Sequence, residues 1–589
     1  MQSKIIYIYI FLLLGLCSCS KILDKTDLSG IDETAWNNES TATLYLNRLY
    51  DIAMPTWPNL QGSATLPTAI HDLADDYNGG DSKLWYGTLS VDNITDFYGG
   101  NASNNAWAYI RKINILLTEI DKGSLDIDTR TKIKSQAYFL RGWIYFQLVK
   151  LYGGIPYLNH PQDWITEDLY VKRNRTSECI DSIARDFDMA VKCPASWGSA
   201  DRGRITRGAA LGIKGRMLMY WASPQFNPNS DQTRWERAYQ ANRHAYDTLL
   251  IDGYTLYSSY ANIWLDEGTG NKEVIMLRSF DGANKASTFD DAARPYSESN
   301  GGGGAYQPTW DMVKAYPTKD GKSIDDATSG YDAVYFWKNR DPRFDATIAY
   351  NGCTWPLSNK TNRRQWNYTG MTDDKSKPCV TGFYCRKNCN TATIKDNTKL
   401  GKTDWIELRL GEVMLNLAEC ANATGRTQEA YDMLIALRKR AGINPGSDNM
   451  YGLQTGLSQD ELRTVILNER HIELAFEGKR YDDMRRNKLF DKLNGTTRKI
   501  LTIAVKAPYT VAILEKTDSE GIMLRDKLDI NGTDYTTYFT ATVGNLDTQQ
   551  PINYPSNYYF YGIPTSNIQR NPSLEQTQGW NSGTFNPYE

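Results

Sequence analysis

Pairs of segments with helical periodicity dominate this chain and most restrict its fold. In each segment the apolar residues recur with the period of an α-helix, and several segments end at a glycine or shortly before a proline. The segments are 106–123 with 132–154, 177–193 with 207–224, a third pair that begins at 234, and 404–426 with 428–442. Consecutive amphipathic helices pack as antiparallel hairpins, so a mainly α fold is predicted.

The helix pairs resemble tetratricopeptide repeats in their length and in the small and aromatic residues at their contacts, although the strict repeat consensus is absent. About four such hairpins are expected as a scaffold. A different composition separates them: residues 251–403 are rich in Gly, Asn, Asp and aromatics, as in "SNGGGGAYQ". So long a loop-rich region is functional or disordered, and its aromatic content favours function. Short strands are expected within it.

The overall composition excludes one class of partner. The chain has 589 residues, 23% of them charged, with a net charge of -3. Because no surplus of positive charge is present to hold a polyanion, nucleic acid is not an expected partner. The 38 Tyr and 16 Trp residues suit a protein that binds flat, hydroxylated ligands, but they also suit wet helix interfaces.

The N-terminus reads as a lipoprotein export signal. Lys4 precedes an apolar run from Ile5 to Leu16, which is followed by "CSCSK". Residues 1–18 are predicted to be the signal peptide, and Cys19 is predicted to be acylated, since Ser18 supplies the small residue before it. More than one acyl chain anchors a protein stably to a membrane. The alternative is an ordinary secretory signal with cysteines there by chance.

Beyond the signal region seven cysteines remain, four of which, Cys353, Cys379, Cys385 and Cys389, lie in one loop-like region. In an exported protein one or two disulfides are expected among them, with the pairing left open. Zinc is a weaker alternative, because the spacing does not match CxxC pairs. Cys420 is expected to be a buried apolar residue.

A densely charged stretch, "NERHIELAFEGKRYDDMRR" (468–486), allows two interpretations. Glu469, Glu473 and Glu477 are spaced at i,i+4, as in helices that bind two metals. However, no Glu-x-x-His or HExxH motif accompanies them, and Arg470 and Arg480 can pair with these acids across turns. We therefore predict one helix laced by ion pairs rather than a metal site.

This stretch resembles the signature helix of the SusD/RagB family, surface lipoproteins that serve outer-membrane nutrient importers of Bacteroidetes-type bacteria. Further stretches match the family in the expected order. They are "AYFLRGWIYFQLVKLYGGIPYL" (137–158), "GAALGIKGRMLMYWASP" (208–224), "DMVKAYPTKDGKSI" (311–324), "NRDPRFDATI" (339–348), "WIELRLGEVMLNLAECANATG" (405–425) and "YGIPTSNIQRNPSLEQTQGW" (561–580). The resemblance extends over essentially the whole chain.

The resemblance implies a SusD-like fold with an N-terminal helical region (19–250) and a SusD/RagB domain (251–589). Within that domain, 251–403 would form much of the ligand face and 404–589 the C-terminal helical region and tail. It also implies an outer-membrane protein that is lipid-anchored and exposed at the cell surface. Such a protein would bind an oligosaccharide or polysaccharide and act as a lid on a SusC-like TonB-dependent transporter. It would catalyse no reaction and need no cofactor.

The ligand contacts are predicted from location and chemistry, because the family has no fixed binding motif. Sugar rings lie on Trp or Tyr faces, while Asp, Asn and Arg hold the hydroxyls. The candidates are Asp75, Asp76, Asn78, Trp85 and Tyr86 in the loop "HDLADDYNGGDSKLWYGTLS", and Tyr296, Tyr306, Trp355, Arg364, Trp366 and Tyr368 in the excursion. Trp107, Trp143, Trp221, Trp310 and Trp337 are assigned to the core.

Three alternatives stay open. The oxygen-rich first loop suits structural calcium, although the EF-hand spacing is absent and no metal ligand is assigned. Peptides also bind aromatic surfaces and are the second choice of cargo after glycans. A glycoside hydrolase needs only two suitably spaced carboxylates, but no local motif nominates a pair.

Overall fold

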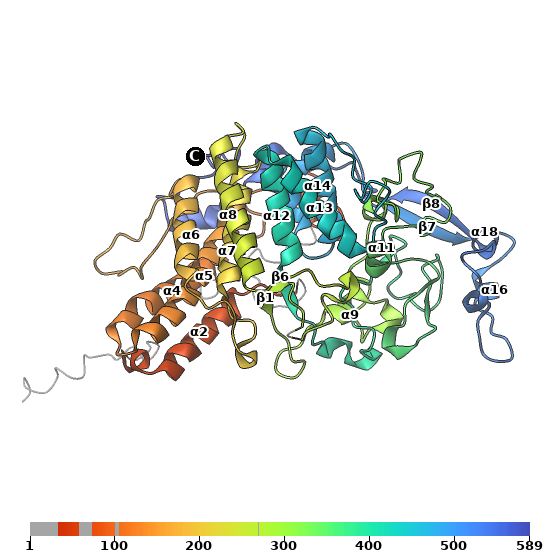
Figure 1. The fold of residues 1–589 in the computed structure, drawn as a ribbon, viewed down its shortest axis with the longest axis horizontal. Helices are drawn as coiled ribbons and strands as arrows, with labels where there is room; N and C mark the ends of the chain where they lie inside the picture. Colours follow the sequence, from red (N-terminus) through yellow and green to blue (C-terminus); the bar gives the residue numbers. More distant parts are fainter. Residues whose placement is uncertain (1–32, 58–73, 101–104, 269) are drawn as a thin grey trace, which may run out of the picture.

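The structure is a computed structural model that describes residues 33–57, 74–100, 105–268 and 270–589. Helices fill one half of the molecule and loops with short elements fill the other (Figure 1). The long helices are α2 (Glu39–Ala53), α4 (Ala106–Glu119), α5 (Ile127–Tyr152), α6 (Thr176–Ala190), α7 (Arg207–Ala222), α8 (Gln232–Ile251), α12 (Leu410–Ala423), α13 (Thr427–Ala441) and α14 (Gln459–Glu473). Successive helices pack side by side, so the predicted mainly α architecture is confirmed.

Local sequence signals place the ends of these helices. The carboxylate of Asp126 accepts hydrogen bonds from the first-turn amides of α5, and the helix ends at Gly153, whose φ of 73° favours glycine. Ser458 and Glu461 form a reciprocal capping box at the start of α14. At its other end α13 stops at Gly442, which has a left-handed conformation.

The segment that precedes α12 is a strand rather than the predicted first turn of a helix. β6 (Trp405–Arg409) pairs antiparallel with β1 (Val274–Arg278). All five residues of β6 are buried, so its apolar run reads equally well as a buried helix turn. The partner strand lies far upstream in the sequence and decides between the two conformations.

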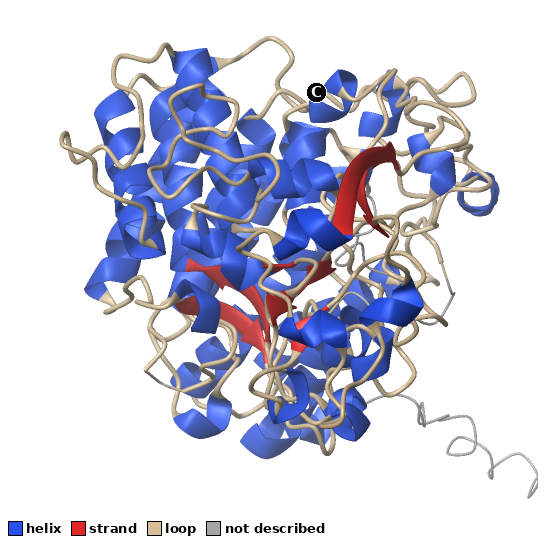
Figure 2. Cartoon of the chain, turned by 90° about the vertical axis from the view of Figure 1, so that its right-hand side faces the viewer, coloured by secondary structure: helices blue, strands red, loops and turns tan. Residues whose placement is uncertain are grey.

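Between α8 and β6 the chain forms short elements. They are β1, α9 (Phe289–Ala293), α10 (Trp310–Ala315), α11 (Pro342–Thr347), β2 (Ile348–Ala349), β3 (Cys353–Thr354), β4 (Arg364–Gln365) and β5 (Tyr384–Cys385). The described strands form two-stranded sheets, β1–β6, β2–β5, β3–β4 and β7 (Lys499–Val505) with β8 (Phe539–Asn545). Figure 2 shows them as short ribbons among helices and loops.

The charged stretch 468–486 is two helices, and the prediction of one continuous helix is wrong. α14 ends at Glu473 and α15 (Arg480–Arg486) begins after a turn that contains Phe476 and Gly478, both with positive φ. Gly478 tolerates this conformation, and the buried Phe476 is held in it by the core around it.

The three glutamates of this stretch pair with basic residues from elsewhere in the chain, whereas Asp483 pairs with Arg470 and Arg486 of the stretch itself. Glu473 contacts Arg343, Arg409 and Arg440, and Glu477 contacts Arg409. These glutamates are buried, so the ion pairs predicted for one helix belong instead to an internal charge network. The network comprises Glu273, Asp341, Glu469, Glu473 and Glu477 with Arg343, Lys387, Arg409, Arg438 and Arg440.

Two hydrophobic clusters form the core, one within the helical half and one beneath the excursion. The tryptophans assigned to the core lie in them: Trp143 is 2% exposed, and Trp221 and Trp337 are 5% exposed. Trp107 and Trp310 are half-buried and pack against the clusters. Among the described residues, no helix is long and apolar enough to cross a membrane.

Candidate functional site

The predicted ligand loop near residue 80 is folded into the body of the protein. Trp85 is 1% exposed, and its ring lies 5.8 Å from that of Phe490 and 4.2 Å from the guanidinium of Arg498. The expectation that Trp85 lies in a solvated loop is therefore wrong, because residues more than 400 positions away in sequence cover it. Tyr86, beside it, is half-buried and keeps an exposed edge.

The polar candidates of this loop also hold it against the rest of the protein. Asp75 accepts two hydrogen bonds from Arg480, at 2.6 and 2.7 Å. Asp76 is 2% exposed, and its burial, reinforced by the neighbouring charge of Asp75, raises its pKa to about 7. Asn78 exchanges hydrogen bonds with the backbone of Gln307. These contacts dock the loop onto α15 and onto the excursion, so these side chains are not the free side chains of a solvated loop that the sequence predicted.

Most of the candidates in the excursion are core residues. Trp355 is fully buried, and Tyr306, Trp366 and Tyr368 are no more than 4% exposed. Their prediction as surface contacts is wrong, because the short sheets and the C-terminal segment fold over them; for example, Trp366 stacks on Phe539.

Arg364 and Tyr296 are the half-buried members of this set. Arg364 donates to the carbonyls of Gly352 and Leu528, and its guanidinium lies 4.8 Å from the ring of Trp366. The ring of Tyr296 lies 5.6 Å below the ammonium group of Lys377. The structure does not bring these two side chains together with Tyr86 into one site.

The described cysteines are all free, which corrects the expectation of disulfides. Cys353, Cys385 and Cys389 are buried, and Cys379 is half-buried with its thiol donating to the carbonyl of Phe383. Burial raises the pKa of Cys379 and of Cys385 to about 12, so each is a neutral thiol. Within the described part of the chain, no group of three or more His, Cys, Asp or Glu side chains is placed to hold a metal ion.

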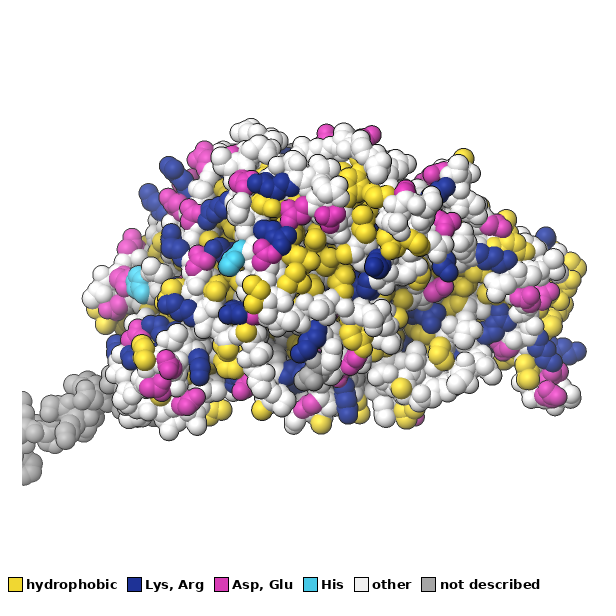
Figure 3. All heavy atoms as spheres, in the orientation of Figure 1, with side chains coloured by type: hydrophobic (Ala, Val, Ile, Leu, Met, Phe, Trp, Pro, Cys, Tyr) yellow, Lys and Arg dark blue, Asp and Glu magenta, His cyan; other side chains and the backbone are white. Residues whose placement is uncertain are grey.

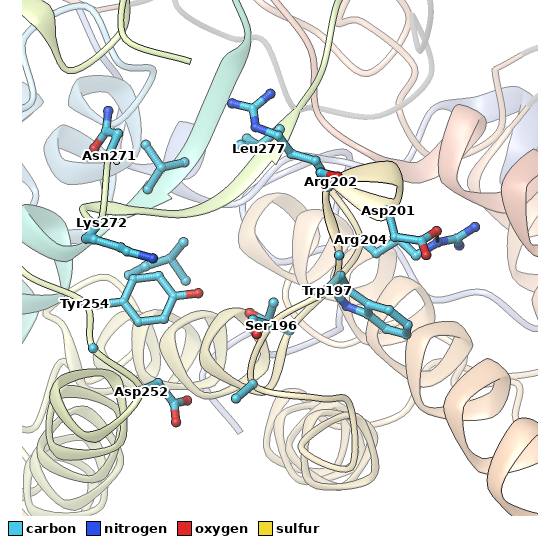
Figure 4. A pocket seen from close by; sticks show the side chains of 18 of the residues that line it. Ser196, Trp197, Asp201, Arg202, Arg204, Asp252, Tyr254, Asn271, Lys272 and Leu277 are labelled. Atoms are coloured by element: carbon cyan, nitrogen blue, oxygen red, sulfur yellow. Dashed lines mark hydrogen bonds and ion pairs between the residues drawn. The ribbon is translucent and has the colours of Figure 1, made fainter. Parts of the chain in front are cut away.

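An open hollow lies instead at one end of the helix bundle (Figure 4). Its volume is about 220 Å³, and its walls come from the loop between α6 and α7, the segment that follows α8, and β1 with the residues before it. These segments are connections between scaffold helices. Loops held by a rigid scaffold are the usual location of binding residues.

Aromatic and polar side chains from separate segments line this hollow. Tyr254 and Lys272 extend from one side, and Trp197 and Arg202 lie on the other (Figure 4). The indole of Trp197 is half-buried and fixed by a 2.8 Å hydrogen bond from Nε1 to the carbonyl of Ile205. The position of this indole ring is therefore set before a ligand arrives.

The carboxylates that line the hollow are already occupied. Asp201 pairs with Arg204 at 2.6 Å, Asp252 pairs with Arg207, and Asp266 accepts from the hydroxyl of Tyr257. Acids held in this way are poor proton donors or nucleophiles. The arrangement is suited to binding through ring faces and hydrogen bonds.

Two more hollows continue this surface. One of about 290 Å³ shares the segment 201–204 and Leu277 with the first and is also lined by the end of α2 and by Lys285. Another of about 550 Å³ is lined by 281–283 and by residues between Asn390 and Lys402. The stretch 271–285 runs along all three hollows, so together they suit an extended ligand.

The comparisons with known proteins extend this picture. The family profile described as "SusD family" matches residues 272–580, more than half of the chain. The chain belongs to the SusD family. A second SusD-like profile, described as "Starch-binding associating with outer membrane", matches residues 23–219.

Relatives of this SusD-family chain cover most of its length. It is 25% identical to SusD-like protein P2 of Formosa agariphila over 66% of this chain and 72% of that protein. A SusD-like protein from Bacteroides fragilis has the same fold, with a TM-score of 0.72, 23% identity, and coverage of 93% and 99% of the two chains. A SusD-like carbohydrate-binding protein from the same species gives a TM-score of 0.70 at 24% identity, with 92% and 100% coverage.

The ligand contacts predicted from the sequence do not include the residues of the hollow. Trp197 follows the helical segment 177–193 in "CPASWGSADRGR", and Tyr254 follows Gly253. An aromatic residue in a Gly- and Ser-rich turn between two predicted helices was the available signal. The predicted contacts lie instead in the loop near residue 80 and in the excursion.

Proposed function

We propose that this SusD-family protein binds an oligosaccharide or polysaccharide at the outer membrane and delivers it to a TonB-dependent transporter. Membership of a family with carbohydrate-binding relatives supports the glycan. The observation that carries the proposal is the row of hollows along 271–285, with Trp197 and Tyr254 among the lining residues at one end.

The physical basis is that of sugar recognition in general. An aromatic face takes up the apolar C–H surface of a sugar ring, and surrounding polar groups replace water at its hydroxyls. Arg202 and Lys272 supply donors at the first hollow, and both are exposed. A chain of sugar units could then occupy the neighbouring hollows in turn.

We further propose that the protein is held at the cell surface by acyl chains on Cys19, which lies outside the described residues. The lipobox-like sequence around Cys19 and the outer-membrane association in the name of the second family profile support this location. Because the carboxylates of the hollow are already paired, we propose a binding protein and not a hydrolase.

A glycan-array experiment followed by calorimetry tests this function. The chain from residue 20 onward retains every residue that the structure describes. We expect binding to one glycan class, and a loss of about tenfold in Trp197→Ala and in Tyr254→Ala, which corresponds to about 1.4 kcal/mol of binding free energy per lost ring contact. Trp164→Ala, at a tryptophan that is 76% exposed elsewhere on the surface, is the matched control.

The outcomes separate the alternatives. Binding that survives both substitutions would place the glycan site away from this hollow. Absence of binding to all glycans together with binding to a peptide library would favour peptide cargo, and release of reducing sugar would show a hydrolase.

A further inference from the structure

A loop between α5 and α6 exposes four large apolar side chains. Trp164 is 76% exposed, Ile165 74%, Tyr170 54% and Leu169 48%. A soluble surface rarely places so many large apolar groups next to each other without a contact that covers them.

Hydrogen bonds make the loop a defined structure. The carboxylate of Asp163 accepts from the amide of Ile165 at 2.9 Å and from the hydroxyl of Thr166 at 2.8 Å. Glu167 lies 2.9 Å from the ring nitrogen of His160. These acids are engaged in shaping the turn, and the apolar side chains are left facing outward.

The ends of the loop are fixed to the body. Arg111 of α4 donates to the carbonyl of Gln162 at 2.8 Å, and Asn571 donates to the carbonyl of Val171 at 2.9 Å. A loop held at both ends keeps its apolar tip in one position. The apolar side chains are therefore exposed on a fixed loop and not on a flexible segment.

The loop lies at the end of the molecule where the described chain begins. α4 holds the loop through Arg111, and the next residue, Lys112, accepts a hydrogen bond through its carbonyl from Tyr45 of α2. In Figure 1 the loop, α2 and α4 all lie at the left-hand end. The stretch from Cys19 to the first described residue, Glu33, can span about 50 Å at most.

We propose that this loop rests in the headgroup region of the membrane that carries the lipid anchor, with Trp164 and Ile165 inserted at its surface. This inference depends on the acylation of Cys19 stated in the proposed function. Trp and Tyr have an apolar ring and a polar tip, which suits them to the boundary between headgroups and acyl chains. The aliphatic Ile165 and Leu169 add apolar area beside them.

The shape of the loop favours this occupant. The loop projects as a narrow tip in Figure 1, which suits insertion between headgroups. Asp163, Glu167 and Asp168 are acidic, so we expect contact with zwitterionic and not strongly anionic lipid. The anchor would keep the loop close to the bilayer, so that weak insertion suffices to orient the protein.

Site-specific fluorescence on the full, acylated chain tests the proposal. The protein is reconstituted on vesicles of phosphatidylcholine and phosphatidylethanolamine, and an environment-sensitive dye is attached at Ile165→Cys. The control is Ile251→Cys, the same residue type at 81% exposure next to the first hollow. Both carry Cys379→Ser, because Cys379 is the described cysteine that is not fully buried.

We expect a blue-shifted emission and quenching by a lipid-soluble nitroxide for the dye at 165, and neither change at 251. Equal emission at the two positions with and without vesicles would overturn the proposal and leave the loop free for a protein partner. Equal shifts at both would also overturn it, because they indicate non-specific adhesion.

Mass spectrometry of the N-terminus and the glycan measurement keep the two proposals distinguishable. An acylated protein that binds glycan but shows no shift at 165 disproves only the role of the loop. A chain without acyl groups on Cys19 disproves the anchor and the loop together, while glycan binding is unaffected.

Discussion

Nη1 of Arg409 lies 2.7 Å from Oε1 of Glu473, with Arg409 1% exposed and Glu473 fully enclosed. Arg409 comes from the end of β6 and Glu473 from the last residue of α14. The same arginine also contacts Glu273, which directly precedes β1. The pair therefore joins the helical half of the molecule to the region of the hollows at a point that water does not reach.

Glu473→Gln should lower the free energy of unfolding by roughly 3–5 kcal/mol, because Arg343, Arg409 and Arg440 lose a buried counter-charge. Urea denaturation followed by circular dichroism measures the change. Glu236→Gln is the control, since Glu236 is 44% exposed and pairs with Arg426 at the surface, where a loss below about 1 kcal/mol is expected. Equal losses in the two variants would contradict a special role for the buried pair.

Gly411→Ala should also destabilise the fold, by about 1–3 kcal/mol, in spite of the higher helix propensity of alanine. Gly411 lies in α12, and a Cβ there would overlap Nη1 of Arg409 and come within 3.0 Å of Glu273. Gly198→Ala, where a Cβ meets no atom within 4 Å, should change the free energy of unfolding by less than about 0.5 kcal/mol. A stabilised Gly411→Ala variant would show that the side chains of the charge network can shift without a loss of stability.

The stability should fall in acid, partly through Glu407. Burial alone would raise the pKa of Glu407, but the charges of Lys479 and Arg216 outweigh it and lower that pKa to about 2. Because the pKa is lower in the folded protein than in the unfolded chain, ionised Glu407 stabilises the fold above about pH 4.5, and this contribution is lost as the pH falls towards 2.

The size of this effect is about 3 kcal/mol. Denaturation midpoints at pH 7, 5 and 3 should therefore vary less in Glu407→Gln than in the unaltered protein. Identical pH slopes in the two proteins would mean that Glu407 titrates alike in the folded and unfolded states.

Thiol labelling checks the state of the cysteines. In the native protein we expect at most Cys379 to react with iodoacetamide, and slowly, because Cys179, Cys193, Cys353, Cys385, Cys389 and Cys420 are buried. After unfolding without reductant, all seven should react, as measured by mass spectrometry. A pair that becomes reactive only after reduction would reveal a disulfide and contradict the structure.

The helices were largely predictable, because their signals are local. The capping box of Ser458 with Glu461 and the glycine after α13 mark helix ends within a few residues of sequence. By contrast, β6 is a strand because β1 pairs with it, and no pattern within "WIELR" specifies that partner.

The candidate site was less predictable for the same reason. Trp85 follows a polar run and reads as exposed, yet Phe490 and Arg498 cover it from the other end of the chain. Glu469 and Glu473 read as partners of nearby arginines, yet both pair with Arg343. Burial of a side chain depends on such distant contacts, whereas helical periodicity does not.

The antiparallel pairing of β1 with β6 joins the two ends of a large insertion between α8 and α12. The chain leaves the bundle after Ile251 in α8 and re-enters it at Leu410 in α12, and these two helices pack directly against each other. β1 and β6 add Ile275, Met276 and Leu408 to the core of the bundle, whereas the apolar core residues between these two strands lie in the second cluster. Loops beyond this strand pair can change in length and sequence without altering how α8 packs on α12. A scaffold of this kind allows new recognition to arise in the loops alone.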